Sequence, residues 1–254
     1  MIFFRSLSGF LKQILAKIKT NIMAINIQKP KNDRRRFLAT LASGAAAAGL
    51  AAIPSVNIHA EENSDFLTDD DPDAWFNKIK GKHRMVFDAT QPHEVLPFAW
   101  PKVFLLTNAA TGTPEKDCGV VVVLRHSAIG YALGHQLWEK YKLGELFHAE
   151  DPKTKQPSTR NPFWMPAKGD FTIPGVGEVQ IGINELQASG VMFCVCNMAI
   201  TVYSAVAAGM MNMKAEDIAK EWKAGLLPGI QVVPSGVWAL GRAQEHGCKY
   251  CFAG

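Results

Sequence analysis

Five cysteines are the residues of this chain best able to do chemistry, and Cys196 has the most informative position among them. It follows the apolar segment 191–195 and precedes the Ala-rich segment 197–208, which predicts a place between a strand and a helix. A thiol there meets free backbone N–H groups and the positive end of a helix dipole, and both favour the thiolate. A thiolate attacks sulfane sulfur or binds a soft metal. The alternative is an inert cysteine that fills the junction between helix and sheet.

Cys194 and His126 are further candidates for the same chemistry. If 191–195 is a strand, Cys194 and Cys196 share one face about 6.5–7 Å apart, which is at or beyond the limit for a disulfide. That spacing suits two ligands of one thiophilic metal, although a buried structural Cys194 is the simpler interpretation. His126 follows Arg125 at the end of another apolar segment, where it could donate to an anion, act as a general base or bind a metal. A structural, hydrogen-bonded histidine fits the position equally well.

A second constellation, His246-x-Cys248-x-x-Cys251, lies near the C-terminal end of the sequence. One histidine and two cysteines could supply three ligands to zinc or copper, and the two cysteines could instead form a redox disulfide. Both hypotheses need a turn, because in an extended strand Cys248 and Cys251 point to opposite faces roughly 10 Å apart. A structural role for all three residues is the alternative.

Apolar and amphipathic segments alternate along the chain after residue 82. Strands are predicted at 83–88, 119–124, 191–195, 230–233 and 247–252, and helices at 98–108, 128–141, 183–189, 197–208, 215–224 and 237–245. The region of about 142–180, rich in Pro, Gly, Lys and Asp, is predicted to be an excursion outside the core. Gly209 is expected to end the helix that begins at 197. The alternation indicates a single α/β domain with a parallel sheet between helices.

In parallel sheets of this kind, ligands bind at the carboxyl ends of the strands. Arg125 and His126 follow one predicted strand, Cys196 follows a second, and residues 234–236 follow a third. We therefore expect these three segments to meet at one edge of the sheet.

Residues 1–60 are predicted to be an N-terminal extension with an export signal. Residues 34–38, with the sequence RRRFL, match a twin-arginine signal, and the mildly apolar segment 37–53 suits its hydrophobic region. Translation is expected to begin at Met23, because such signals place the arginine pair near the start. A linker is expected at 61–81. The protein would reach the periplasm already folded, with the twin-arginine translocase as its partner during export. A retained anchor and a basic stretch before a surface helix are the alternatives.

The net charge changes sign along the chain. The whole sequence carries +4, but residues 1–60 hold nine of its 27 Lys and Arg residues and one of its 23 Asp and Glu residues, which leaves −4 after residue 60. A negatively charged exported part argues against nucleic acid as a partner. No segment after residue 53 is long and apolar enough to predict a stable membrane span.

Several elements resemble the DsrE/DsrF-like family of sulfur-relay proteins. They are the strand–Cys–helix pattern of 191–208, the Leu-Pro-Gly of 227–229, the Val-Pro-Ser-Gly-Val of 233–237 and the Arg-x-Gln of 242–244. With its twin-arginine signal and its Cys-x-x-Cys-Phe-Ala-Gly tail, the chain is similar to a signal-bearing subgroup. The resemblance spans roughly residues 82–254. It implies a flavodoxin-like three-layer α/β/α fold, homo-oligomers, and a persulfide on a cysteine whose place Cys196 occupies here.

Three interpretations of the function follow from these observations. The leading hypothesis is an exported protein that binds or relays sulfane sulfur as a persulfide on Cys196, with His126 as a nearby polar partner. The rival is a non-catalytic periplasmic protein that binds a small ligand or a metal, zinc or copper. Its metal ligands would be His246, Cys248 and Cys251, with Cys194 as a weaker addition. An oligomeric scaffold without chemistry is the third interpretation.

Overall fold

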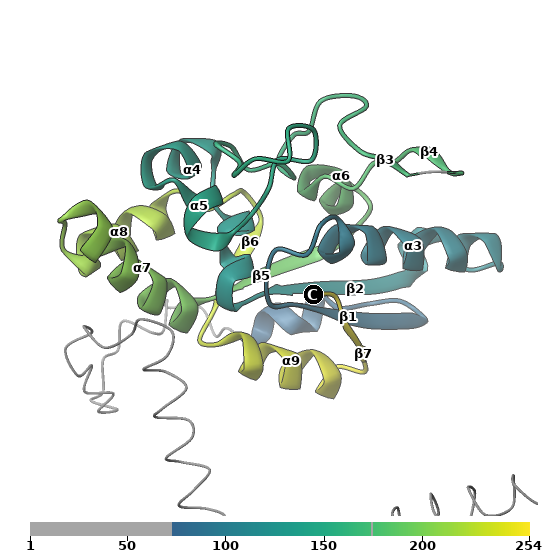
Figure 1. The fold of residues 1–254 in the computed structure, drawn as a ribbon. Helices are drawn as coiled ribbons and strands as arrows, with labels where there is room; N and C mark the ends of the chain where they lie inside the picture. The colour runs from purple at the N-terminus through teal and green to yellow at the C-terminus, as the bar shows by residue number, and fades with distance from the viewer. Residues whose placement is uncertain (1–72, 174) are drawn as a thin grey trace, which may run out of the picture. The chain divides into compact units, whose positions relative to one another are not determined.

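A five-stranded parallel sheet forms the centre of the protein. The computed structural model describes residues 73–173 and 175–254, and Figure 1 labels their helices and strands. The strands are β1 (His83–Ala89), β2 (Cys118–Leu124), β5 (Met192–Cys196), β6 (Ile230–Val233) and β7 (Lys249–Phe252), in the order β6-β5-β2-β1-β7. All four pairings are parallel. The predicted α/β class with a parallel sheet is confirmed.

Helices cover both faces of this sheet, which gives three layers. The α-helices are α3 (Leu96–Ala110), α4 (His135–Tyr141), α5 (Leu143–Phe147), α6 (Ile183–Ala188), α7 (Asn197–Met211), α8 (Ala215–Ala224) and α9 (Gly236–Glu245), and the 3-10 helices are η2 (Ala74–Lys78), η3 (Glu115–Asp117) and η4 (His126–Ala132). Figure 1 shows α3 and α9 on opposite faces of the sheet. The α9 face is also covered by η2, whose Trp75 and Phe76 pack beside Ala239 and Ala243 in one hydrophobic cluster.

Strand β2 shows why the sheet is buried on both faces. Every residue from Cys118 to Leu124 is buried. Val120 and Val122 belong to the larger hydrophobic cluster, which includes residues of α3 to α8, whereas Val121 and Val123 belong to the cluster under α9. Alternate side chains of a strand point to opposite faces, so a continuously apolar sequence fits a strand between two helical layers.

Two predicted helices have different bounds in the structure. The expected helix over 128–141 is wrong, because the chain forms η4 and then α4, with Gly134 as the N-cap of α4 and Leu133 in an isolated β-bridge to Leu226. Gly209 does not end α7, which continues to Met211 and stops at Asn212 in the left-handed conformation, with φ 53°. A glycine inside a helix costs about 1 kcal/mol, which packing against α8 can offset, and asparagine tolerates positive φ.

The prediction that 142–180 is an excursion outside the core is wrong in part, because several of its residues enter the core while its hairpin stays at the surface. The segment contains α5 and a short hairpin of β3 (Thr172–Ile173) and β4 (Gly177–Glu178). Phe147, Phe163 and Phe171 are buried in the larger hydrophobic cluster, where the rings of Phe163 and Phe171 stack at 4.8 Å. Aromatic burial therefore anchors a segment whose overall composition is polar.

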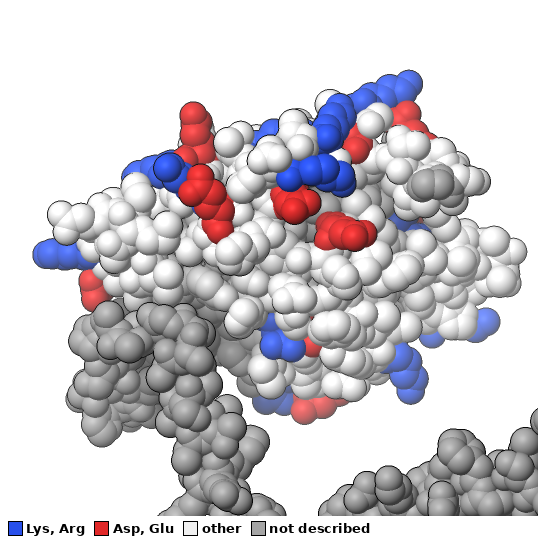
Figure 2. Space-filling view, in the orientation of Figure 1, with Lys and Arg blue, Asp and Glu red and all other residues white. Residues whose placement is uncertain are grey.

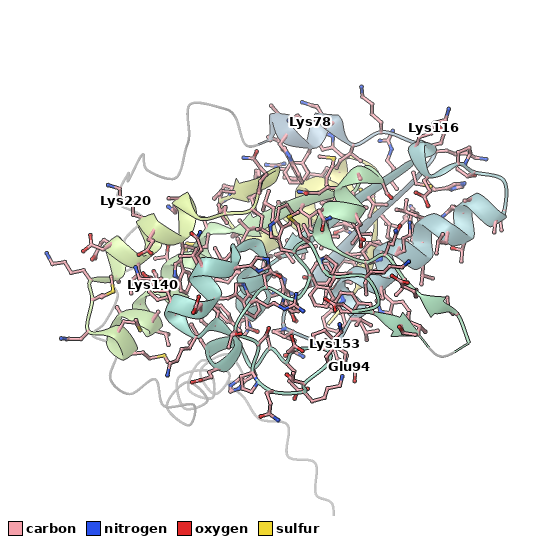
Figure 3. The ribbon with its side chains drawn as sticks, turned by 90° about the horizontal axis from the view of Figure 1, so that it is seen from above. Lys78, Glu94, Lys116, Lys140, Lys153 and Lys220 are labelled. Carbon is pink, nitrogen blue, oxygen red and sulfur yellow. The ribbon has the colours of Figure 1, made fainter. Side chains whose placement is uncertain are left out.

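Charged side chains mark the rim of the molecule. Figure 3 shows Lys78 and Lys116 on one side of the described chain and Lys153 and Glu94 on the other. Lys140 of α4 forms an ion pair with Glu221 of α8 at 2.6 Å, and Tyr141 donates a hydrogen bond to the same carboxylate. These contacts connect α4 to α8 at the surface.

The predicted export signal and most of the predicted linker lie outside the described residues. Within residues 73–173 and 175–254, no helix combines the length and the apolar character needed to cross a membrane.

Candidate functional site

The carboxyl ends of three neighbouring strands meet where the sequence predicted. Leu124 pairs with Val195, and Cys196 pairs with Val233. Arg125 and Cys196 are the residues that come next after the pair of Leu124 and Val195, so their backbones are adjacent. The backbone N–H of Met198 donates to the carbonyl oxygen of Pro234 at 3.3 Å, which joins the start of α7 to the turn before α9.

Cys196 is the N-cap residue of α7. Its Sγ atom accepts a hydrogen bond from the backbone N–H of Ala199 at 3.3 Å, and only 6% of the residue is exposed. The first N–H groups of a helix have no partner within the helix, so a sulfur in this place satisfies one of them and lies at the positive end of the helix dipole. The thiol is thus shielded from solvent, and its sulfur accepts one backbone hydrogen bond.

Asn197 provides a buried acceptor in the same turn. The residue is 5% exposed, and its Oδ1 atom has no hydrogen-bond partner among the described residues. A buried polar atom without a partner costs about 1–3 kcal/mol, so this oxygen is suited to a donor that arrives from outside the chain. Nothing in the sequence singled out Asn197, because an asparagine at the start of a helix is common for structural reasons.

Arg125 is held by a buried carboxylate. Its Nε donates to Oδ1 of Asp88 at 2.6 Å and its Nη2 donates to Oδ2 at 2.9 Å, while the hydroxyl of Tyr250 donates to Oδ2 at 2.9 Å. Asp88 is 1% exposed, and its hydrogen bonds to the guanidinium raise the pKa of Arg125. Asp88 and Tyr250 were not among the residues predicted from the sequence, although a charged residue near the end of a buried strand is a signal for Asp88.

Gly236 makes room for this arginine at the start of α9. A Cβ atom at position 236 would lie 2.5 Å from Cβ of Arg125, which is closer than two carbon atoms can approach. The glycine therefore lets the aliphatic stem of Arg125 lie against the N-terminus of α9.

His126 lies at the same edge, but its described polar contacts are to residues other than Cys196. The hydroxyl of Tyr203 on α7 lies 3.4 Å from Nδ1 and 3.3 Å from Nε2, and Oγ of Ser127 lies 3.3 Å from Nδ1. His126 is exposed and has a φ of 49°. Burial raises the pKa of Tyr203, so its hydroxyl stays protonated near neutral pH.

The proposed metal ligands of the C-terminal constellation do not converge. Cys248 packs in the cluster under α9, whereas Cys251 packs against the larger cluster on the other face. This is the extended arrangement that suits neither a metal nor a disulfide. The ring of His246 lies 6.0 Å from the ring of Phe76. Among residues 73–173 and 175–254, no group of three His, Cys, Asp or Glu side chains is arranged to hold a metal ion.

Four of the five cysteines, including Cys196, are buried, and Cys251 is partly exposed. All five thiols are free. Burial raises the pKa of Cys194 and of Cys251, and it raises the pKa of Cys248 to about 11 although Arg84 acts in the opposite direction. Cys194 is fully buried in the cluster under α9, whereas Cys196 belongs to the larger cluster. The expectation that these two thiols share one face of the strand is therefore wrong.

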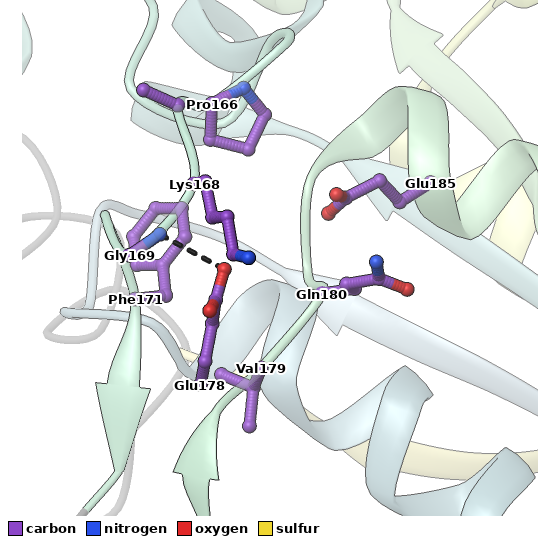
Figure 4. A pocket seen from close by; sticks show the side chains of 9 residues that line it. Pro166, Lys168, Gly169, Phe171, Glu178, Val179, Gln180 and Glu185 are labelled. Atoms are coloured by element: carbon purple, nitrogen blue, oxygen red, sulfur yellow. Dashed lines mark hydrogen bonds between the residues drawn. The ribbon is translucent and has the colours of Figure 1, made fainter.

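A separate hollow of about 420 Å³ lies between the β3–β4 hairpin and the start of α6 (Figure 4). Two carboxylates line it, and each already accepts a backbone hydrogen bond: Glu178 from Gly169 at 3.0 Å and Glu185 from Gly182 at 2.8 Å. None of the cysteine-site residues lines this hollow.

The fold and the site together define a class: an α/β protein with a helix-capping cysteine at the carboxyl edge of a parallel sheet. No protein-family model matches the sequence, and no curated protein matches it. Among solved structures, a protein of unknown function from Methanobacterium thermoautotrophicum is similar, with a TM-score of 0.35 and 18% identity over 67% of this chain and 99% of that one. A likeness this weak transfers neither fold nor function.

The two shielded thiols Cys196 and Cys248 are a matched pair for a reactivity test, because they are 6% and 4% exposed. Burial raises the pKa of Cys248 to about 11, so only a small fraction of this thiol is thiolate at pH 8. We predict that iodoacetamide at pH 8 alkylates Cys196 before Cys248, and that alkylation of Cys248 rises with pH towards pH 11. Peptide mass spectrometry measures both rates, and equal rates at pH 8 would contradict the assignment of Cys196.

Proposed function

We propose that this protein is an exported, DsrE-like carrier of sulfane sulfur, with Cys196 as the atom that holds it. The observation that carries the proposal is the hydrogen bond from the Ala199 N–H to Sγ of Cys196, at the N-terminus of a 15-residue helix. Thiolate is the form that attacks sulfane sulfur, and a helix N-terminus favours it. The resemblance of residues 191–208 and 227–244 to sulfur-relay proteins supports the same cysteine.

The transfer needs no redox partner. The thiolate of Cys196 attacks the outer sulfur of a persulfide, R–S–SH, so that a new S–S bond forms while the original S–S bond breaks. The leaving group is the thiolate R–S⁻, and Cys196 becomes a persulfide. Attack by an acceptor thiolate on the outer sulfur reverses the step and restores Cys196. Throughout, the Ala199 N–H is placed to stabilise negative charge on Sγ.

The supporting polar group proposed from the sequence, His126, takes a less direct role here. It is exposed and contacts Tyr203 and Ser127, which supports a role in meeting a donor or acceptor that arrives from solvent. The metal-binding rival has no comparable support. Cys248 and Cys251 pack against different hydrophobic clusters, and the ring of His246 lies beside that of Phe76.

A persulfide-labelling experiment tests this function. After brief treatment of the reduced protein with a small organic persulfide, we predict one added sulfur atom on the peptide containing Cys196. Cys196→Ser should lose the added sulfur, and Cys251→Ser, the matched control at a partly buried thiol, should keep it. Labelling that is absent from wild type, or that persists in Cys196→Ser, rejects the proposal.

Export by the twin-arginine pathway is the second element of the proposal. It rests on residues 34–38 and on the mildly apolar segment 37–53. We predict that changing Arg34 and Arg35 together to Lys keeps the protein in the cytoplasm, because the translocase recognises the arginine pair. Cell fractionation with immunoblotting measures this. Replacing Lys29 and Lys31 by Arg is the control, and this variant should still be exported. Periplasmic recovery of the Arg34→Lys, Arg35→Lys variant would contradict the prediction of twin-arginine export.

Self-association is the third element. Trp100, Val103 and Leu106 are exposed three residues apart along α3, and Figure 2 shows a largely uncharged surface over this helix. Exposed apolar surface of this kind is typical of an interface. We predict that Leu106→Glu lowers the molar mass measured by light scattering to that of one chain, whereas Lys220→Glu on α8 does not. A wild-type protein that is monomeric at all concentrations overturns this element.

A further inference from the structure

One edge of the Arg125 guanidinium is occupied and the other is open. Asp88 accepts from Nε and Nη2, and within residues 73–173 and 175–254 no residue accepts from Nη1. The Arg125 side chain is 28% exposed, in contrast to the 2% of the Asp88 side chain. A guanidinium has five N–H donors, so the edge formed by Nη1 and the second hydrogen of Nη2 can still bind a planar anion.

The open edge belongs to a side chain with a fixed position. The two hydrogen bonds to Asp88 set the plane of the guanidinium, the hydroxyl of Tyr250 fixes the carboxylate, and Gly236 accommodates the stem. A donor pair that is already oriented loses little side-chain entropy when it binds a ligand.

Arg125 and Cys196 follow two adjacent strands, β2 and β5. They follow the paired residues Leu124 and Val195, and adjacent strands lie about 4.8 Å apart. The Cys196 side chain is close enough to act electrostatically on the Arg125 guanidinium. A ligand a few bonds long could therefore contact both groups.

We propose that the sulfur donor is the persulfide of a small thiol that carries a carboxylate, and that Arg125 binds this carboxylate. This inference rests on the proposed function, because it names the substrate class of the same site. Asp88 balances the charge of Arg125, so recognition depends on the geometry of the paired N–H donors and on the nearby start of α9, more than on net charge.

The carboxylate takes no part in the covalent step. Sγ of Cys196 attacks the outer sulfur of ⁻OOC–CH₂–CH₂–S–SH, the S–S bond of the donor breaks, and ⁻OOC–CH₂–CH₂–S⁻ leaves with the electron pair. The proton stays on the transferred sulfur, so charge and atoms balance without an oxidant. Arg125 is therefore a positioning residue, and its removal should raise KM more than it lowers kcat.

The test compares two donors that differ at one end, the persulfides of 3-mercaptopropionate and of 2-mercaptoethanol. We predict that wild type forms the Cys196 persulfide about tenfold faster with the carboxylate donor at low concentration, as expected for one charged hydrogen-bonded pair. Arg125→Met should remove the preference and Arg125→Lys should keep only part of it. Lys116→Met, on η3 and away from the carboxyl ends of the strands, should leave it unchanged.

The outcomes separate the two proposals. If neither donor labels Cys196 in wild type, the sulfur-carrier function and the carboxylate inference both fail. If both donors label Cys196 at equal rates, or if a folded Arg125→Met keeps the preference, only the carboxylate inference is overturned. The wild-type comparison needs no variant, so it decides the matter even if loss of Arg125 unfolds the protein by leaving Asp88 unpaired.

Discussion

The parallel register of β2, β5 and β6 is the constraint on which the rest of the site depends. Because Leu124 pairs with Val195, and Cys196 with Val233, three loops that are distant in the sequence must leave the sheet at one edge. Parallel strands end on the same side, and the helices that follow them present unpaired N–H groups there. Cys196 uses this geometry directly, since it is both the last residue of a strand and the cap of a helix.

The ion pair of Asp88 and Arg125 is the second interaction that the site requires. A carboxylate that is 1% exposed is unfavourable unless it is paired and hydrogen-bonded, and here it accepts three hydrogen bonds. Loss of one partner of such a buried pair costs about 3–5 kcal/mol, because the other charge is left uncompensated. The stability of the edge and the orientation of Arg125 are therefore coupled, and Gly236 connects both to the start of α9.

The prediction from sequence succeeded where a local pattern and the tertiary environment agree. The run Cys118–Leu124 is apolar throughout and is a buried central strand. It failed at 128–141, where periodic apolar residues suggested one helix but the bridge from Leu133 to Leu226 interrupts it. It also failed for the segment after residue 142, whose polar composition concealed the buried rings of Phe147, Phe163 and Phe171. Average composition does not reveal which few residues enter a core.

The sequence by itself determined the alternation of strands and helices, and with it the place of Cys196 between a strand and a helix, because hydrophobic periodicity is local. Only the tertiary structure decided which polar groups accompany that cysteine. Asp88 on β1, Arg125 after β2 and Tyr250 on β7 are distant in the sequence, and only the sheet brings their polar groups together. It also decided that Cys248 and Cys251 point apart, because the conformation of a short C-x-x-C segment depends on whether it pairs with a neighbouring strand.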